Sequence, residues 1–341
     1  MKRKLSLLLV LVMLFAVALS ACNSTEEGTE GNEGTEGNEG TEGNEGTEAV
    51  NIKLATGGTT GTYYAYGGVL GTLFESKIDG LTVDVQSTGA SKANIVLVCD
   101  DEVQMAIVQN DVMDYAYNGT DQFEGDKMEG FSSMAACYAE VCQIIANPDS
   151  GIATVADLAG KRVSVGDAGS GVEFNTRQIL EAYGLTFDDI KVQNLGFEDS
   201  ANALKDGKID AFFCTAGAPT TAISSLATTN DIVVLNVDGE EAAALIEKYP
   251  FYTAYDIPAD TYPGMTEAAT TVAVKATLIV ADDLSEDLVY NLTKTLFENK
   301  AEVEAGNAKG SELDVNYAVE GVSVPFHPGA EKYFKEAGAL S

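Results

Sequence analysis

The apolar positions between residues 50 and 341 follow two periods, one typical of strands and one typical of helices. The segments VNIKLAT (50–56) and LTVDVQST (81–88) predict strands, because apolar and polar residues alternate in them or form short buried runs. The segments YYAYGGVLGTLFESK (63–77) and GSGVEFNTRQILEAYGL (169–185) have helical spacing. Such predicted strands and helices alternate along the chain, which indicates an α/β fold.

Two such βα series follow one another, and the remaining C-terminal stretch is too short for a third domain of its own class. The simplest arrangement packs that stretch back onto the first series. We therefore predict two lobes joined by two chain crossovers, with lobe 1 formed by 50–140 and 256–341 and lobe 2 by 141–255. One long helix is expected in SEDLVYNLTKTLFENKAEVEAG (285–306).

The N-terminus has the pattern of an export signal. Three basic residues precede an apolar run too short to span a bilayer comfortably, so residues 1–21 are expected to be removed. The run ends in Leu-Ser-Ala-Cys, which resembles a bacterial lipobox, and this resemblance implies a diacylglyceryl thioether on Cys22. The alternative is ordinary cleavage that leaves Cys22 as a free thiol. Residues 22–49 repeat EGTEGN in tandem and predict an acidic Gly/Glu/Asn/Thr tether without a core.

The formal charge of −33 changes which partners are plausible. A chain this acidic is a poor ligand for nucleic acid or for anionic lipid, so we expect no nucleic acid and a membrane association through the lipid anchor only. Cys99, Cys137, Cys142 and Cys214 lie in apolar runs and are expected to be buried thiols without disulfide or metal bonds.

Four loops at the ends of predicted strands are rich in Gly, Ser or Thr, namely 57–62, 88–94, 167–171 and 215–217. In open α/β sheets, ligands lie at the carboxyl ends of strands and against helix N-termini, where backbone N–H groups favour anions. The loops therefore predict a site for a small anion, although each could also be only a tight βα turn. Tyr63 could wall this site or donate a hydrogen bond.

Little in the sequence points to catalysis. His327 is the single histidine and lies between turn residues, no G-x-S-x-G or Walker A motif is present, and no metal-ligand cluster stands out. We expect no enzyme activity, no cofactor and no metal, with an anchored hydrolase or an adhesin as alternatives. Arg177 could contact an anionic ligand or lie on a solvated helix face, whereas Arg162 is expected at the wrong end of its strand. Glu173 and Asp167 could pair with an ammonium group.

The segment ATGGTTGTYYAYGG (55–68) resembles the signature TGG-x-x-GTYY-x-x-GG of the TAXI family, the extracytoplasmic receptors of TRAP transporters. The resemblance continues through QSTGASKANIVLV, DSGIATVADLAGKRVSVGDAGSG and ALKDGKIDAFFCTAGAP and spans 51–338. It implies a type II periplasmic-binding-protein-like fold with two interlobe crossovers. It also implies capture of a small carboxylate, such as glutamate, glutamine or a 2-oxoglutarate-like acid. Val172 departs from the family, whose members often carry threonine there.

By the same resemblance, ligand-binding residues are expected in all four loops, on two predicted strands and, at Asn175, in a predicted helix. They are Gly57, Gly58, Thr59, Thr60, Gly61, Thr62, Tyr63, Thr88, Gly89, Ser91, Asn94, Gln109, Tyr138, Gly169, Ser170, Gly171, Asn175, Ala216 and Gly217. Tyr138 and Glu140 would lie near the first crossover, and 252–257 near the second. The implied protein is a monomeric, lipid-anchored receptor on the extracytoplasmic face of the cell membrane, with TRAP permease subunits as partners. An ABC-type substrate-binding lipoprotein of the same fold is the alternative.

Overall fold

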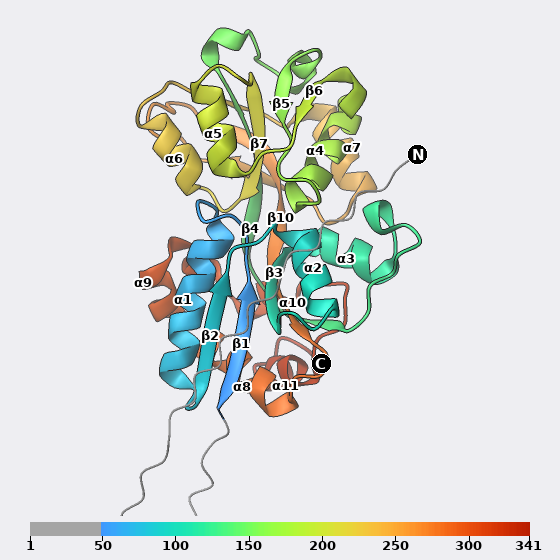
Figure 1. The fold of residues 1–341 in the computed structure, drawn as a ribbon, viewed down its shortest axis with the longest axis vertical. Helices are drawn as coiled ribbons and strands as arrows, with labels where there is room; N and C mark the ends of the chain where they lie inside the picture. Colours follow the sequence, from blue (N-terminus) through green and yellow to red (C-terminus); the bar gives the residue numbers. More distant parts are fainter. Residues whose placement is uncertain (1–48) are drawn as a thin grey trace, which may run out of the picture. The chain divides into compact units, whose positions relative to one another are not determined.

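The computed structural model describes residues 49–341, so the predicted signal, Cys22 and the tether lie outside the described residues. A ten-stranded sheet in the order β2-β1-β3-β10-β4-β7-β5-β6 runs through this unit, with β8 paired to β4 and β9 to β10 (Figure 1). The strands are β1 (Val50–Ala55), β2 (Leu81–Gln86), β3 (Met105–Gln109), β4 (Phe131–Ala146), β5 (Arg162–Ser164), β6 (Lys191–Gln193), β7 (Ala211–Ala216), β8 (Val233–Leu235), β9 (Thr253–Ile257) and β10 (Ala269–Ala281).

The helices lie on both faces of this sheet. They are α1 (Thr62–Lys77), α2 (Ser91–Cys99), α3 (Asn110–Asn118), α4 (Gly171–Ala182), α5 (Phe197–Lys205), α6 (Thr221–Ala227), α7 (Gly239–Lys248), α8 (Glu286–Glu298), α9 (Lys300–Gly306), α10 (Val315–Val319) and α11 (Pro328–Glu336). The strands β1, β2 and β3 are parallel, as are β5, β6 and β7, whereas β4 and β10 are antiparallel to their neighbours. The single sheet therefore consists of two parallel parts, each with helices on both faces, and the antiparallel strands β4 and β10 join these parts.

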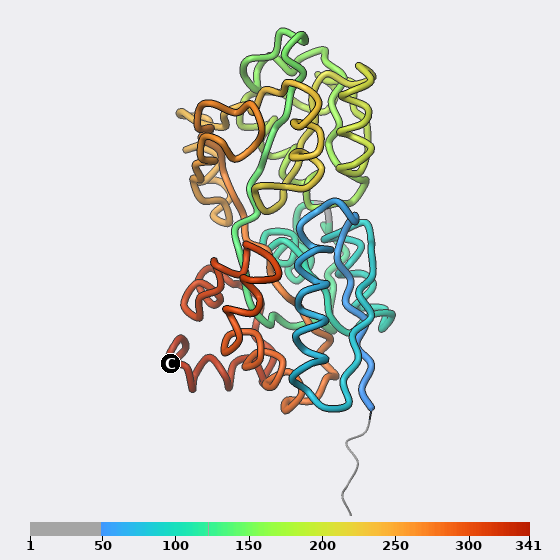
Figure 2. Tube along the Cα trace, turned by 90° about the vertical axis from the view of Figure 1, so that its left-hand side faces the viewer, coloured from blue at the N-terminus to red at the C-terminus, as the bar shows by residue number. Residues whose placement is uncertain are grey.

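The long strands β4 and β10 carry the chain between the two halves (Figure 2). Their pairing shifts register between Ala276 and Thr277, where Ala276 still faces Tyr138. A register shift bends a strand and weakens its local pairing. The bend therefore lies at the point where both strands pass from one half to the other.

Separate hydrophobic clusters lie on the two sides of this point. One half packs α1, α8 and α11 on one face of the sheet and α2 and α3 on the other. The other half packs α4 and α7 on one face and α5 and α6 on the other. The predicted two-lobed α/β fold with two crossovers is thus the one observed. From here on, lobe 1 is the half that carries α1 and lobe 2 the half that carries α4.

The packing bears on where the chain passes from lobe 2 back to lobe 1, which was expected at 252–257 from the sequence. Ile257 and Tyr262 belong to clusters with lobe 2 residues, and β9 pairs with β10 inside that half. We therefore propose that the second crossover lies on β10 near Ala276 instead of at 252–257. The C-terminal segment after β10 packs beside α1 in lobe 1, as expected from the length of the chain (Figure 2).

Some elements differ from the sequence-based expectation. The long helix expected at 285–306 is broken at Asn299, whose φ of −115° and ψ of 31° are not helical and whose side chain donates to the Thr295 carbonyl. The helix α3 and the strand β9 were not expected. Cys137, Cys142 and Cys214 are buried free thiols as predicted, but Cys99 is only half-buried.

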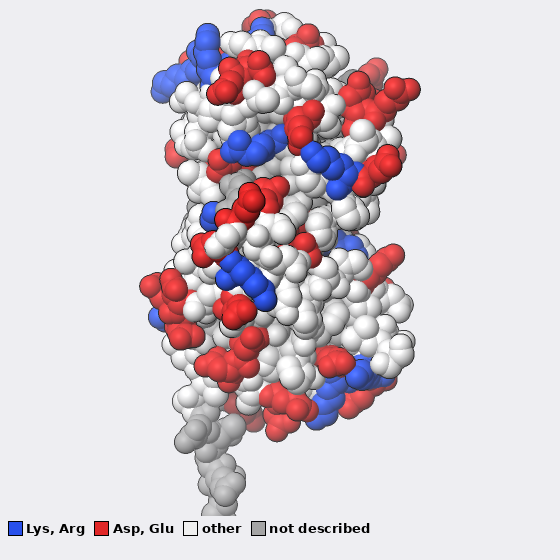
Figure 3. Space-filling model, turned by 90° about the vertical axis from the view of Figure 1, so that its right-hand side faces the viewer, with Lys and Arg blue, Asp and Glu red and all other residues white. Residues whose placement is uncertain are grey.

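The surface of the described unit carries many carboxylates. On the face in Figure 3, Asp and Glu side chains are spread over both lobes, with Lys and Arg scattered among them and no continuous basic patch. Within residues 49–341, none of the helices combines the length and the apolar character that a membrane span requires.

Candidate functional site

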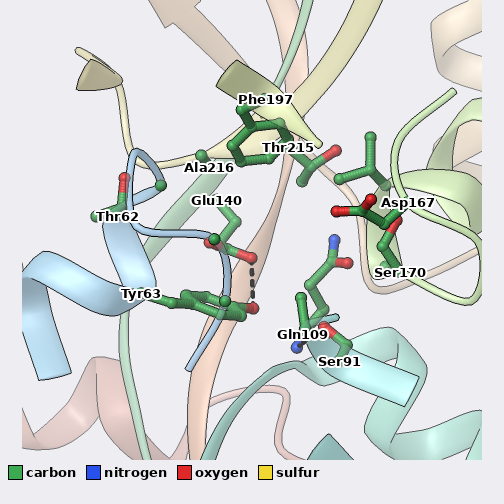
Figure 4. A pocket seen from close by; sticks show the side chains of 16 residues that line it. Thr62, Tyr63, Ser91, Gln109, Glu140, Asp167, Ser170, Phe197, Thr215 and Ala216 are labelled. Carbon is green, nitrogen blue, oxygen red and sulfur yellow. Dashed lines mark hydrogen bonds between the residues drawn. The ribbon is translucent and has the colours of Figure 1, made fainter. Parts of the chain in front are cut away.

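A cleft lies between the two lobes and contains about 520 Å³ of space that no atom occupies, open solvent included. The ends of β1, β3, β5 and β7 meet there with the starts of four helices (Figure 4). Its lining residues come from both lobes and from β4. They are Gly57, Gly58, Gly61, Thr62, Tyr63, Ala90, Ser91, Gln109, Glu140, Asp167, Ser170, Gly171, Val172, Phe197, Thr215 and Ala216.

Helix N-termini surround this cleft. The helices α1, α2, α4 and α5 all begin at lining residues. The first turns of α1 and α2 contain no acidic residue that would offset the positive end of the helix. The first N–H groups of a helix have no partner within the helix and carry about half a positive charge in total. Backbone donors are therefore available to a negatively charged group from more than one direction.

Ala90 has an unusual backbone conformation at the start of α2. Its φ is 67° and its ψ is −150°, a combination that only glycine adopts readily. The turn is held by the Thr88 hydroxyl, which accepts from the Ala90 N–H at 3.2 Å, and by Asn94, whose side-chain amide donates to the Thr56 and Ile107 carbonyls. The surroundings therefore maintain a strained backbone beside the cleft.

Glu140 on β4 is the most buried ionisable group of the cleft, at 2% exposure. The Tyr63 hydroxyl donates to its Oε2 at 2.7 Å, and this hydrogen bond is drawn in Figure 4. Burial raises the pKa of the Glu140 carboxyl to about 8, while the hydrogen bond from Tyr63 opposes that shift. Glu140 is therefore largely protonated at neutral pH unless a positive charge comes close.

No Lys or Arg side chain is among the cleft-lining residues of the described chain. Lys309 lies behind the cleft and is engaged with Glu312 at 2.7 Å. Across the cleft, burial and the nearby Asp199 raise the pKa of Asp167. The cleft lining thus contains two carboxyl groups and no cationic side chain, and positive potential comes from the backbone.

Several contacts join the lobes around the cleft. The Thr62 hydroxyl donates to the Gly217 carbonyl at 3.2 Å. The Gln109 side-chain amide donates to Asn175 at 2.6 Å, and Asn175 in turn donates to Asp111 at 2.9 Å. Gly171 lies so close to Gln109 that a Cβ atom at Gly171 would be 1.2 Å from the Gln109 Oε1. The lobes are therefore closed upon each other in this structure.

An aromatic contact extends this closure. Phe174 belongs to α4 in lobe 2, yet it is fully buried within the lobe 1 cluster that includes Phe123. Its ring stacks on that of Tyr115 with centroids 6.0 Å apart. Opening of the lobes would expose this ring to water.

Many of the residues predicted from the sequence line the cleft. They are Gly57, Gly58, Gly61, Thr62, Tyr63, Ser91, Gln109, Ser170, Gly171 and Ala216. The others are not among its lining residues. They are Thr59, Thr60, Thr88, Gly89, Asn94, Tyr138, Gly169, Asn175 and Gly217. Tyr138 in particular is fully buried against Tyr66 in the lobe 1 core, so the expectation that it contacts a ligand finds no support in the geometry.

Two other candidate ligand contacts, Arg177 and Glu173, have partners elsewhere, and Arg162, which was expected at the wrong end of its strand, also has one. Arg177 lies over the Phe187 ring at 4.1 Å and is half-exposed, which fits the solvated helix face. Glu173 accepts from the Gly169 N–H at 2.6 Å, so it stabilises the turn that precedes α4. Arg162 forms an ion pair with Asp210 at 2.6 Å and lies away from the cleft.

Phe197 and Glu140 were absent from the predicted ligand-binding residues. The loop before Phe197 follows β6 and therefore also lies at the carboxyl end of a strand, where ligands are expected. It was missed because it contains a single glycine and no hydroxyl group. Glu140 is an acidic residue within an apolar strand, and such a residue signals a buried functional carboxyl.

Among residues 49–341, the remaining chemistry-bearing groups do not form a second site of this kind. The imidazole of His327 accepts from the Gly329 N–H at 3.2 Å and lies 3.0 Å from the Leu284 carbonyl, so it caps α11. Among the described residues, no group of three or more His, Cys, Asp or Glu side chains could hold a metal ion.

Comparison with known proteins gives a family and a fold. The model of the NMT1-like family matches residues 54–338. A solved structure from Bordetella bronchiseptica RB50 has a TM-score of 0.53 and 17% identity, and the match covers 85% of this chain and 89% of that one. The fold class expected from the sequence, periplasmic-binding-protein-like with two crossovers, is confirmed.

Two further solved structures are similar at lower TM-scores. The alkanesulfonate-binding protein SsuA from Xanthomonas axonopodis pv. citri, bound to MOPS, has a TM-score of 0.48 and 13% identity, over 85% of this chain and 84% of that one. A putative L-cystine ABC transporter from Listeria monocytogenes has a TM-score of 0.47 and 16% identity, over 77% of this chain and 98% of that one.

Proposed function

This chain belongs to the NMT1-like family, and we propose that it is an extracytoplasmic solute-binding receptor that captures a small carboxylate in the cleft between its lobes. Glutamate, glutamine and 2-oxoglutarate-like acids are the expected guests. The observation that carries the proposal is the convergence of three glycine- and hydroxyl-rich loops, before α1, α2 and α4, on one cleft. Loops from both lobes take part, so closure encloses the guest.

The helix N-termini support a carboxylate guest. Backbone N–H groups at the starts of α1, α2 and α4 face a cleft that has no cationic side chain in its lining among residues 49–341. A carboxylate can accept from such N–H groups without an arginine clamp. Catalysis is not part of the proposal, because Tyr63, Ser91 and Glu140 are held in hydrogen bonds that form no nucleophile–base pair.

We further propose that the receptor delivers its guest to a TRAP-type permease driven by an ion gradient. The resemblance of residues 55–68 to the TAXI signature supports this partner. The acidic tether and a lipid at Cys22 would hold the receptor on the extracytoplasmic face of the cell membrane as a monomer. Genes for permease subunits beside this one, without a gene for an ATPase, would agree with the proposal, and an adjacent ATPase gene would favour an ABC importer instead.

The ligand class is tested by titration of the purified protein with glutamate, glutamine, 2-oxoglutarate and C4 dicarboxylates. A ligand at one hundred times its Kd stabilises a folded protein by about 2.7 kcal/mol, which raises the melting temperature by several degrees. We expect such a rise with at least one of these acids and none with chloride at equal ionic strength. If none of them raises the melting temperature, the proposed ligand class is wrong.

A further inference from the structure

The cleft contains carboxyl groups of its own, and these restrict which carboxylates it can bind. Glu140 and Asp167 both line it, and Figure 4 shows them on two sides of the same space. A guest with only negative groups would place no cation beside either carboxyl, so its binding would require Glu140 to keep its proton and would bring like charges together wherever a carboxyl is ionised. Positive charge on the guest would remove this conflict.

Glu140 has capacity for a further hydrogen bond. Its Oε2 accepts from Tyr63, and this is the one hydrogen bond that its carboxyl makes among the described residues. The nearest cation, Lys309, is paired with Glu312 and only slightly opposes the effect of burial on the pKa of Glu140. A buried carboxyl without a cationic partner is an unfavourable arrangement unless it is protonated or a cation binds beside it.

Positive potential in the cleft comes from other groups. The starts of α1, α2 and α4 direct backbone N–H groups toward the cleft. Tyr63 links the two kinds of group, because it lies in the first turn of α1 and its hydroxyl fixes the Glu140 carboxyl. One small space therefore offers donors for an anion and an acceptor for a cation.

We propose that Glu140 is a specificity-determining residue that accepts hydrogen bonds from an ammonium group of the guest, while the helix N-termini bind its carboxylate. The guest is thus a small zwitterion of the α-amino acid class, and amine-free dicarboxylates are rejected. This inference rests on the proposed function and selects among its expected guests. Tyr63 orients the carboxyl for this contact.

The test compares acids that differ only in the amino group. Wild-type protein is titrated calorimetrically with L-glutamate against glutarate and with L-alanine against propionate, after a melting-temperature survey of the standard L-amino acids and their amine-free counterparts. We expect the best amino acid to bind at least about thirtyfold more tightly than its amine-free counterpart, because a charge-assisted hydrogen bond is lost with the amine.

Two variants add a test of the residue. Glu140→Gln is expected to weaken the best amino acid about thirtyfold or more and to reduce the preference over its amine-free counterpart, whereas the exposed Glu302→Gln should change neither. The melting temperature of each unliganded variant is measured first. If Glu140→Gln fails to fold, the wild-type comparison of matched acids still decides.

The outcomes separate this inference from the proposed function. Equal or tighter binding of an amine-free acid, or unchanged amino-acid affinity in folded Glu140→Gln, would overturn the role of Glu140 and leave the carboxylate receptor intact. Absence of binding by every acid in the survey, with or without an amine, would overturn the proposed function and this inference together.

Discussion

Ala90 shows how one residue's backbone shapes the cleft. Its conformation with φ of 67° costs a non-glycine residue about 1–3 kcal/mol. We therefore expect Ala90→Gly to raise the free energy of unfolding by about 0.5–1 kcal/mol, since relief of strain outweighs the added entropy of the unfolded chain. Urea unfolding measures the change. Ala93→Gly, within α2, is the matched control and should lower the free energy of unfolding by about 1 kcal/mol. An equal loss of stability in both variants would show that the Ala90 backbone is not strained.

Asp111 predicts a pH dependence of stability. Burial raises the pKa of this carboxyl to about 7, and hydrogen bonds, including one from Asn175, oppose the shift. Because the folded protein binds this proton more tightly than the unfolded chain does, the contribution is present below about pH 4 and is lost as the pH rises to about 7.

The variant Asp111→Asn removes this titration. Its melting temperature relative to the wild type is therefore expected to increase between about pH 4 and 7 and to stay constant above that range. Glu140, whose pKa is raised mainly by burial, remains in both proteins, and loss of the Asp111 charge lowers the pKa of Glu140 in the variant. A difference that does not change with pH would show that Asp111 is ionised throughout.

The Gly, Ser and Thr content of the loops predicted the position of the cleft better than it predicted the role of each residue. Glycine and hydroxyl residues near strand ends pointed to Gly57, Ser91 and Gly171. These residue types are informative because glycine, which has no side chain, lets the backbone approach a ligand closely. The resemblance to a known signature also suggested Tyr138, but side-chain direction along β4 depends on register, and the register shift near Ala276 is not visible in the sequence.

At the scale of elements, the contact between the start of α4 and the end of β3 sets how closely the lobes approach. A Cβ atom at Gly171 would overlap the Gln109 side chain. We expect Gly171→Ala to hold the lobes apart and to weaken binding of the best amino acid at least about tenfold, because the α1 and α4 termini no longer reach one guest together.

Gly68→Ala is the matched control for this contact. Gly68 lies on the outer face of α1, with nothing within 4 Å of the added Cβ, and the substitution should leave affinity unchanged and slightly stabilise the helix. Calorimetric titration of both variants measures the effect. Wild-type affinity in Gly171→Ala would show that closure at α4 is unnecessary for binding.

Element boundaries were predictable where local signals were strong. Ser170 caps α4 by accepting from the Glu173 N–H, and this helix begins at Gly171, two residues after the start of the predicted segment. The break at Asn299 was missed because the apolar spacing continues across it from Leu296 to Val303, so that only tertiary packing reveals the interruption.

At the scale of the whole molecule, the two-lobed arrangement follows from topology. The alternation of strands and helices predicted two βα series, and the length of the C-terminal stretch predicted its return to lobe 1. The position of the second crossover could not be read from periodicity, because β10 is apolar on both sides of Ala276 and pairs with β4 on both sides of the register shift. The insertion of Phe174 from lobe 2 into the lobe 1 cluster also has no local signal, because it joins segments that are far apart in the sequence.

The central claim is that loops of both lobes bind one guest in the closed cleft. Amide hydrogen exchange of the purified protein, with and without the amino acid that raises its melting temperature most, tests it directly. We predict that exchange slows together in three segments, 57–64, 88–94 and 167–173, of which the first two belong to lobe 1 and the third to lobe 2. Slowing confined to one lobe, or located away from these segments, would contradict the account.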